Sequence, residues 1–260
     1  MMAYSYGVTL LILCPLIFLA AFIDSIAGGG GLISLPAYLL AGLPIHNAHG
    51  TNKFTASMGT AMAAVNYMRS RKVDYPAALA GGLCALGGAW AGTSIALAMS
   101  PRLLQLCLVI ILPLAGVFIL SRRGREEGAP REALSPVKKI IFSALAGLVI
   151  GCYDGFFGPG TGMFLTIAFS TLVRLELIRA AGTARVINLS SNLASMLTWL
   201  RGGHIIFSLA IPGMICAIAG GYVGSRLAIR VGQKLIRRVL VVVAILLFIR
   251  ILWDLLATMR

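Results

Sequence analysis

Charged residues are scarce in this sequence, and acidic residues are scarcer still. Only 12% of the 260 residues are charged, against about 25% in soluble domains, and 8 Asp and Glu stand against 22 Lys and Arg. Hydrophobic residues make up 59% of the chain and fall in long runs with almost no charge, such as 103–120 and 239–253. Because a bilayer-spanning helix needs about 20 mostly apolar residues, the chain has room for about eight passes and none for a separate soluble domain.

Several other features are missing as well. No Lys or Arg precedes the first apolar run and no small-residue cleavage site follows it, so we expect no removable signal peptide. No two of the five cysteines have metal or redox spacing, and we expect neither a metal site nor a cofactor. The net charge of +14 would suggest nucleic acid in a soluble protein. Here the basic residues lie in short loops between apolar runs, where they set membrane topology, so we exclude nucleic-acid binding.

The two halves of the chain repeat each other. A consistent offset over about 70 residues predicts an architecture built from two copies of one unit. We expect the first copy in 1–121 and the second in 139–260, joined by a cytoplasmic linker at 122–138 that is rich in Arg, Glu and Pro. The matches are Asp24, Gly28 and Gly30 with Asp154, Gly158 and Gly160, 130 residues later, and Gly50-Thr51-Asn52-Lys53 with Gly182-Thr183-Ala184-Arg185, 132 residues later.

Each copy begins with a long apolar stretch that glycines break, at 28–31 and at 158–162. An unbroken helix over the first stretch would be about 52 Å long, too long for one pass, which favours a hairpin of two shorter helices. The expected fold is therefore an all-α integral membrane protein with two inverted repeats, each a glycine-broken helix hairpin plus three transmembrane helices. The further helices are expected at about 49–68, 75–98, 103–121, 181–200, 205–228 and 235–257.

Loop charge supports the inverted arrangement. A cytoplasmic linker places 17 of the 22 basic residues inside, and a single-pass alternative would put the basic cluster at 226–238 outside, against the positive-inside bias. We therefore predict a multi-pass protein of the bacterial inner membrane with both termini outside, although the two topologies differ in only part of the chain. A homo-oligomer is compatible with the sequence, which does not fix the number of copies. The basic residues left outside are Lys53, Arg102, Arg201, Arg250 and Arg260.

The glycine breaks are the first candidate site. Transporters often hold substrate where inverted repeats have broken helices, and helices that start after a break direct free N–H groups at an anion. A helix kink or close packing is the alternative. A nucleotide-binding loop is excluded, because no strand precedes the second break and no Lys follows it. The break glycines are Gly28, Gly29, Gly30, Gly31, Gly158, Gly160 and Gly162.

Charged and polar residues near the breaks complete the candidate site. Lys53 and Arg185 occupy equivalent positions and suit a compact oxyanion, with interfacial snorkelling as the alternative. Asp24 and Asp154 lie four residues before their breaks, where they could carry protons or bind backbone N–H groups. Further candidates for substrate binding, with helix-to-helix hydrogen bonding as the alternative, are Asn52, Thr183, Asn188 and Asn192.

These motifs carry a family resemblance. Ala27-Gly28-Gly29-Gly30-Gly31-Leu32-Ile33 with Pro36, followed by Ala48-His49-Gly50-Thr51-Asn52-Lys53, resembles the signature of the TauE/SafE sulfite exporter family over almost the whole chain. The resemblance implies a membrane protein of about eight helices that exports sulfite, sulfoacetate or a related anion. The second copy departs from the motif at Pro159, Thr161 and Ala184, so we expect the two half-sites to be chemically unequal.

The sequence thus favours a secondary transporter of a small anion, sulfite or a related sulfur oxyanion or organosulfonate, coupled to protons. A passive anion channel is the main alternative. An intramembrane enzyme is less favoured, because His46, His49 and His204 supply no nucleophile–base pair or metal cluster.

Overall fold

The computed structural model describes residues 5–104, 106–107, 134–232, 235 and 238–239, and this part of the chain is helical with no strand. The predicted helices at 103–121 and 235–257, the linker at 122–138 and both termini lie mostly or wholly outside the described residues. The helices are α1 (Tyr6–Ala27), α2 (Gly31–Leu40), α3 (Ile45–Arg69), α4 (Tyr75–Ala98), α6 (Pro136–Phe156), α7 (Thr161–Thr171), α8 (Leu177–Arg201) and α9 (Phe207–Val231).

Both glycine-rich stretches break a helix and turn the chain back on itself. Gly28 and Gly158 have φ angles of 75° and 92°, which glycine adopts without the steric penalty of a Cβ. The helices on either side of each break pack together, α1 on α2 and α6 on α7, as the hairpin prediction requires. With 10 and 11 residues, α2 and α7 are each about 15 Å long. They reach only about half-way across a hydrocarbon core of ~30 Å, so the breaks lie inside the structure.

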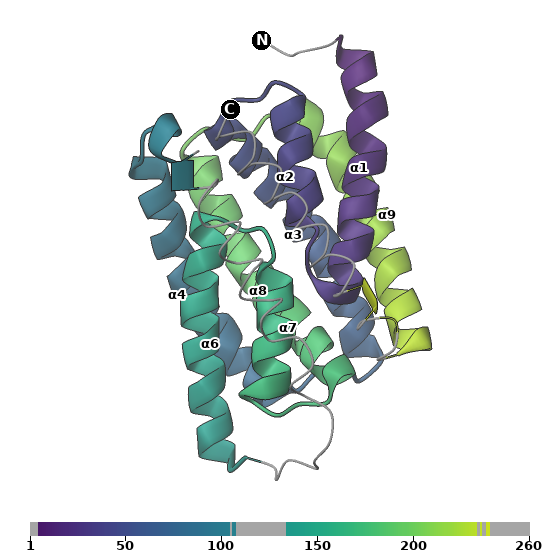
Figure 1. Cartoon of the computed structure of the whole chain (residues 1–260), viewed down its shortest axis with the longest axis vertical. Helices are drawn as coiled ribbons and strands as arrows, with labels where there is room; N and C mark the ends of the chain where they lie inside the picture. Colours follow the sequence, from purple (N-terminus) through teal and green to yellow (C-terminus); the bar gives the residue numbers. More distant parts are fainter. Residues whose placement is uncertain (1–4, 105, 108–133, 233–234, 236–237, 240–260) are drawn as a thin grey trace, which may run out of the picture.

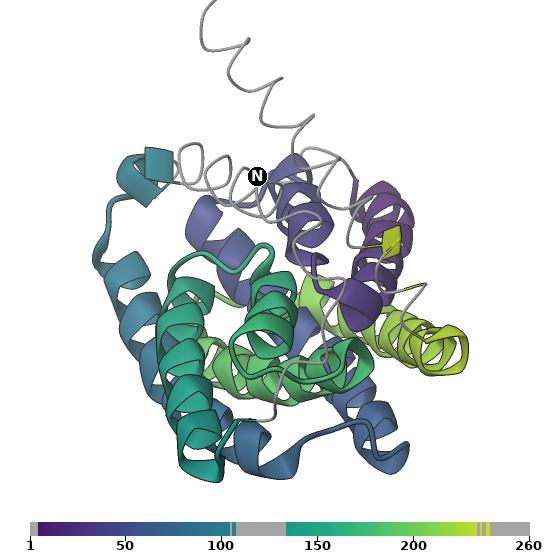
Figure 2. The same ribbon diagram turned by 60° about the horizontal axis from the view of Figure 1, so that its bottom comes forward.

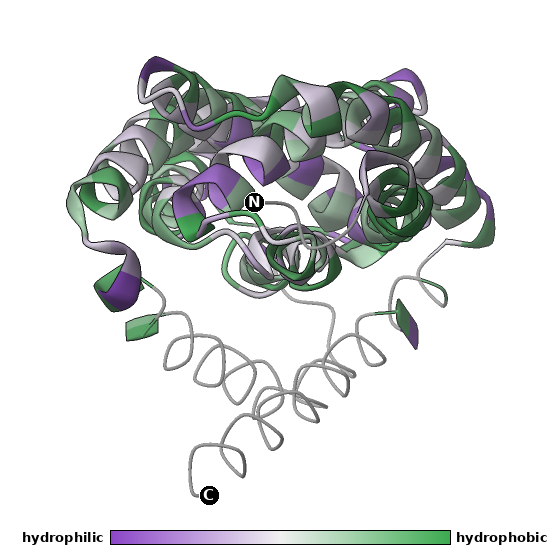
Figure 3. Cartoon of the chain, turned by 90° about the horizontal axis from the view of Figure 1, so that it is seen from above, coloured by the Kyte–Doolittle hydropathy of each residue, from purple (hydrophilic) through white to green (hydrophobic). Residues whose placement is uncertain are grey.

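Within the described residues, four helices are long and apolar enough to cross a membrane: α1, α4, α6 and α9. Their outward faces carry large exposed hydrophobic side chains, for example Leu11, which is 76% exposed, with Leu79 and Ile215. Viewed from above, the outer helices are mainly hydrophobic, whereas hydrophilic segments lie among the inner helices as well as in the loops (Figure 3). A soluble protein would cover its outer surface with polar side chains, whereas here the outer surface is apolar and polar residues lie inside. This distribution is that of a membrane protein.

The inner helices α3 and α8 have 25 residues each and are much more polar. They pack against each other, α3 also packs against α9, and α8 also packs against α4. Both start four residues before their predicted positions, so Lys53 lies about two turns inside α3 rather than at its start. Pro44 and Glu176, which immediately precede the two helices, mark these earlier starts.

The outer helices pair across the two halves of the chain. Figures 1 and 2 both show α1 beside α9 and α4 beside α6, on opposite sides of the molecule. Glycines allow this close packing: a Cβ at Gly92 would lie 2.0 Å from the Cys152 carbonyl oxygen, and one at Gly224 would lie 2.4 Å from that of Phe22. These glycines therefore serve helix packing. The first helix of each half is thus held by the last described helix of the other half.

Candidate functional site

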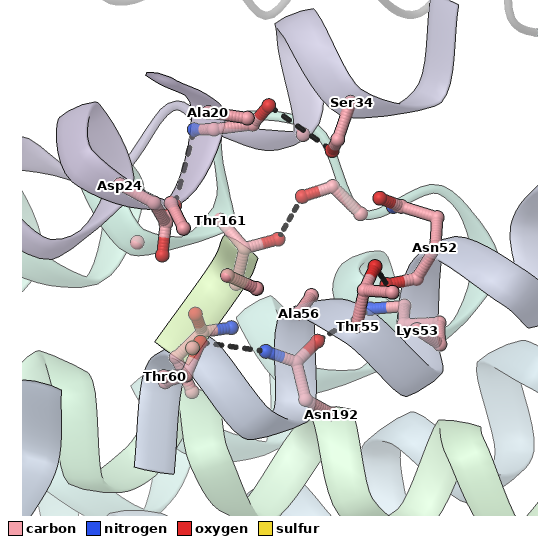
Figure 4. A pocket seen from close by; sticks show the side chains of 18 of the residues that line it. Ala20, Asp24, Ser34, Asn52, Lys53, Thr55, Ala56, Thr60, Thr161 and Asn192 are labelled. Carbon is pink, nitrogen blue, oxygen red and sulfur yellow. Dashed lines mark hydrogen bonds between the residues drawn. The ribbon is translucent and has the colours of Figure 1, made fainter. Parts of the chain in front are cut away.

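A half-open cavity lies where the two breaks meet α3 and α8. Its volume of about 50 Å³ exceeds the roughly 10–15 Å³ that one ordered water needs. Ser34, Asn52 and Lys53 direct polar atoms into it, and Asn192 donates to the Thr60 hydroxyl in its wall (Figure 4). The wall is otherwise made of small side chains, including Ala20, Ala21, Ala56, Gly59 and Ala217.

One buried ion pair forms part of the cavity wall. Lys53 Nζ lies 2.9 Å from Asp154 Oδ1, and the two side chains are 3% and 2% exposed. Lys53 also donates to Asn192 Oδ1 at 3.0 Å. The second carboxylate oxygen of Asp154 accepts from the Ser191 hydroxyl at 2.6 Å and from the Asn188 amide at 3.4 Å. All of these partners come from α3 and α8, so the packing of these two inner helices against the end of α6 builds this half of the site.

A second ion pair also joins the two halves, but its cation comes from the second half and its carboxylate from the first. Arg185 Nη1 lies 3.1 Å from Asp24 Oδ2 and donates to the Asp24 carbonyl at 2.7 Å, and Nη2 donates to the Gly162 carbonyl at 3.0 Å. Asp24 Oδ1 accepts from the backbone N–H groups of Gly29 and Gly30, both at 3.1 Å. The guanidinium group therefore ties the first break to the second, while the Asp24 carboxylate satisfies donors at the start of α2.

The two breaks touch at their backbones. A Cβ on Gly28 would lie 2.2 Å from the Gly162 carbonyl carbon and 2.4 Å from the Met163 nitrogen. Only glycine permits this approach, because the contacting atoms are backbone and cannot rotate away. The contact explains why both breaks are rich in glycine and fixes the half-helices α2 and α7 around one cavity.

Comparison with known proteins agrees with this architecture. A family model described as "Sulfite exporter TauE/SafE" matches residues 13–251. The chain belongs to the TauE/SafE family. It is 34% identical over 238 residues to the probable membrane transporter protein YfcA of Escherichia coli strain K12, covering 91% of this chain and 87% of that protein. A probable membrane transporter protein of Haemophilus influenzae is 34% identical over 239 residues, covering 91% of this chain and 92% of the relative. No solved structure matches the chain.

Most of the site residues predicted from sequence meet at this cavity of the TauE/SafE chain. Those in its wall are Asp24, Gly30, Gly31, Asn52, Lys53, Asp154, Gly158, Gly162, Asn188 and Asn192. The remaining candidates lie outside the wall: Gly28, Gly29 and Gly160 shape the breaks, and Arg185 is fully buried behind the two breaks. Lys53 and Arg185 are thus not a joint cation pair facing one anion, since each is matched with an aspartate of the other half.

Thr183 is placed away from the cavity. Its hydroxyl accepts from the Asp74 backbone N–H at 3.0 Å, which anchors the loop before α4. The equivalent Thr51 accepts from the Ile206 N–H at 3.1 Å, before α9. The repeated Gly-Thr motif therefore holds equivalent loops in the two halves.

Several lining residues carry no motif and were not singled out from sequence. They are Ser34, Thr55 and Thr60, together with the small residues of the wall. Thr60 alone had a readable signal, because it lies 132 residues before Asn192, at the repeat offset. These two equivalent residues are in contact, because Asn192 Nδ2 donates to Thr60 Oγ1 at 3.4 Å. The two halves of the chain therefore meet at the cavity.

The histidines form a separate cluster at one end of α3 and α8. His46 lies 5.3 Å from His204 and 5.7 Å from Trp199, between ring centroids, and His49 stacks on Trp199. Burial lowers the pKa of His204, which lies in the loop after α8, and His46 nearby adds to this effect. Across the described ranges no group of three or more His, Cys, Asp or Glu residues could hold a metal ion. We interpret the cluster as packing.

Proposed function

We propose that this protein is a secondary transporter that moves a small anion, sulfite or a related sulfur oxyanion or organosulfonate, across the inner membrane in a proton-coupled cycle. One observation carries the proposal: a half-open cavity at the two helix breaks, whose partly polar wall contains a buried lysine ammonium group. The names of the family and of its relatives support transport rather than enzymatic chemistry.

The chemistry of the wall suits a compact oxyanion. The Lys53 ammonium has three N–H donors, of which two bond Asp154 and Asn192, so a third is open to a ligand. Thr60 adds a hydroxyl group that accepts from Asn192 and can rotate to donate to a ligand. The Thr161 hydroxyl, in contrast, already donates to the Gly158 carbonyl at 2.7 Å. The half-helices α2 and α7 begin at the wall and direct the positive ends of their dipoles toward it. A small oxyanion would find donors on several sides.

Transport requires that the cavity open to each side in turn. In Figure 1, α1 runs downward from its N-terminal end while α6 runs upward, which supports our proposal of two inverted repeats. The cytoplasmic linker and the external termini are proposed from the loop charges. We propose that the repeats rock against each other around the contact between Thr60 and Asn192. Cysteines at accessible positions in 122–138 should react with impermeant reagents only from the cytoplasmic side, and those at both termini only from outside.

The decisive test is uptake of ³⁵S-labelled sulfite by proteoliposomes, with and without a pH gradient, with sulfoacetate, thiosulfate and sulfate as competitors. The pair Lys53→Gln with Asp154→Asn removes both charges without leaving one buried alone, and we expect it to abolish flux in a folded protein. The matched control is Lys139→Gln with Asp74→Asn, because that Lys–Asp pair has a 2.8 Å contact but lies toward the opposite end of α6. Flux without accumulation would indicate a channel. Normal flux in the first double variant would refute the site.

A further inference from the structure

The ion pairs at the cavity balance each other in charge. Of the described residues at the cavity and the breaks, two are cations, Lys53 and Arg185, and two are carboxylates, Asp24 and Asp154, joined as two pairs. An anion entering this arrangement would leave one negative charge uncompensated in a buried site, which is strongly unfavourable. Binding therefore requires that one carboxylate lose its charge or its partner.

The Arg185 pair is not built for that exchange. Its guanidinium group is fully buried and lies outside the cavity wall. Besides the Asp24 carboxylate, it bonds the backbone carbonyls of Asp24 and Gly162. Asp24 in turn accepts two backbone N–H groups, which are fixed donors and stabilise the ionised carboxylate. An anion could reach this arginine only by separating the two breaks.

The Lys53–Asp154 pair is suited to an exchange of its carboxylate for an anion. Lys53 lies in the wall, and its flexible stem can move the ammonium group between Asp154 and a ligand. Asp154 accepts from the hydroxyl of Ser191, which can rotate and accept a hydrogen bond from a protonated carboxyl group instead. Asp154 can therefore be accommodated both with and without its proton.

Few other ionisable groups face Asp154. Asp24 lies across the cavity, already paired with Arg185. Tyr153 on the same helix donates its hydroxyl to the Pro159 carbonyl. Neither α4 nor α7, which pack against α6, contains Asp, Glu, Lys, Arg or His. On α8, the other arginines, Arg179 and Arg201, are exposed toward its ends.

We infer that the transported anion and the Asp154 carboxylate compete for Lys53, so that each anion binds together with one proton on Asp154. This inference rests on the proposed proton-coupled anion transport and adds the residue that carries the proton and the stoichiometry. The site has two stable conditions: empty with the ion pair formed, or loaded with both anion and proton. A singly charged anion then crosses with no net movement of charge.

The test uses wild-type and Asp154→Asn proteoliposomes loaded with ³⁵S-sulfite tracer, at an acidic pH at which the anion is mainly singly charged bisulfite. At a one-to-one ratio, a pH gradient of one unit drives about tenfold accumulation of a singly charged anion, and a potassium–valinomycin potential has no effect. In Asp154→Asn, Lys53 has no competing carboxylate. We expect exchange of sulfite for sulfite to persist, accumulation driven by the pH gradient to fall from about tenfold to about onefold, and uptake to become sensitive to the membrane potential. Asp74→Asn, at the control pair, should behave as the wild type.

Failure of this inference differs from failure of the proposed function. Absence of any sulfite flux in the wild type would refute the transport assignment. Wild-type flux that the membrane potential drives, or an Asp154→Asn variant that still accumulates sulfite tenfold with the pH gradient, would overturn the competition mechanism alone. The wild-type potential measurement decides the question even if Asp154→Asn does not fold.

Discussion

The two halves of the chain place the same kind of ion pair beside the cavity but surround it differently. At the 132-residue offset, Lys53 corresponds to Arg185, and the residues one and two turns later differ in size and polarity. Asn188, Ser191 and Asn192 of α8 give polar contacts around Asp154 and Lys53. The corresponding residues of α3 are Ala56, Gly59 and Thr60, which line open space.

This difference assigns separate tasks to the halves. In the proposed mechanism, small residues on α3 leave the volume that a substrate needs, whereas polar residues on α8 hold the exchangeable ion pair that meets it. The Arg185 pair, bonded mainly to backbone, fixes the breaks. A duplicated fold has thus kept its frame in both copies, while the chemistry has concentrated at one ion pair. The predictions below separate the frame from the chemistry.

The largest effect is expected at the break contact. Gly28→Ala would force a Cβ against the Gly162 and Met163 backbone at 2.2–2.4 Å, and we expect a loss of more than about 4 kcal/mol or failure to fold. In Gly158→Ala the new Cβ comes no closer than 3.4 Å to any atom, the nearest being Lys53 Nζ. The main cost is therefore the positive φ angle, about 1–2 kcal/mol. Thermal unfolding in detergent measures both variants. Equal losses would contradict the backbone contact.

The second comparison exchanges the cations. Arg185→Lys keeps the charge, but an ammonium group cannot reach both the Asp24 and the Gly162 carbonyls. We expect the free energy of unfolding to fall by about 2–3 kcal/mol. Lys53→Arg points its larger group toward the cavity, so we expect a loss of about 1 kcal/mol and reduced sulfite flux. Thermal stability and flux should therefore separate the two variants. A Lys53→Arg protein as unstable as Arg185→Lys would remove the distinction between frame and binding group.

Sequence predicts those features of the fold and the site that come from local or periodic patterns, and misses those that depend on contacts between distant segments. The breaks, the four residues from Asp24 to Gly28 and the repeat offset are local or periodic, so hairpins and site glycines were readable. The pairing of Lys53 with Asp154 was not, because it depends on how α3 and α6 pack across the halves. Ala184 opposite Asn52 indicated unequal half-sites, but the larger inequality lies at Ala56 and Asn188, a turn farther along the same helices.

The third comparison transfers a residue between the halves. Ala56→Asn copies Asn188 into α3 and fills part of the cavity, so we expect the KM for sulfite flux to rise about tenfold, which corresponds to about 1.4 kcal/mol. Asn188→Ala removes only a long 3.4 Å contact to Asp154, and its KM should change less than about threefold, or about 0.7 kcal/mol. Concentration-dependent uptake gives both values. If Asn188→Ala were the more damaging change, the substrate space would lie on the α8 side.

The smallest effect is expected where the halves are equivalent. Thr51 and Thr183 make the same hydrogen bond to a loop N–H, at 3.1 and 3.0 Å. Replacing either with Val keeps the shape and removes the acceptor, so each variant should lose about 1 kcal/mol of stability with no change in the KM for sulfite. Thermal unfolding and uptake of the two variants measured side by side provide the check. A raised KM in Thr183→Val alone would return Thr183 to the substrate site, whereas matched losses of stability would show that the Gly-Thr motif maintains the repeated frame and leaves selectivity to the lysine-bearing half.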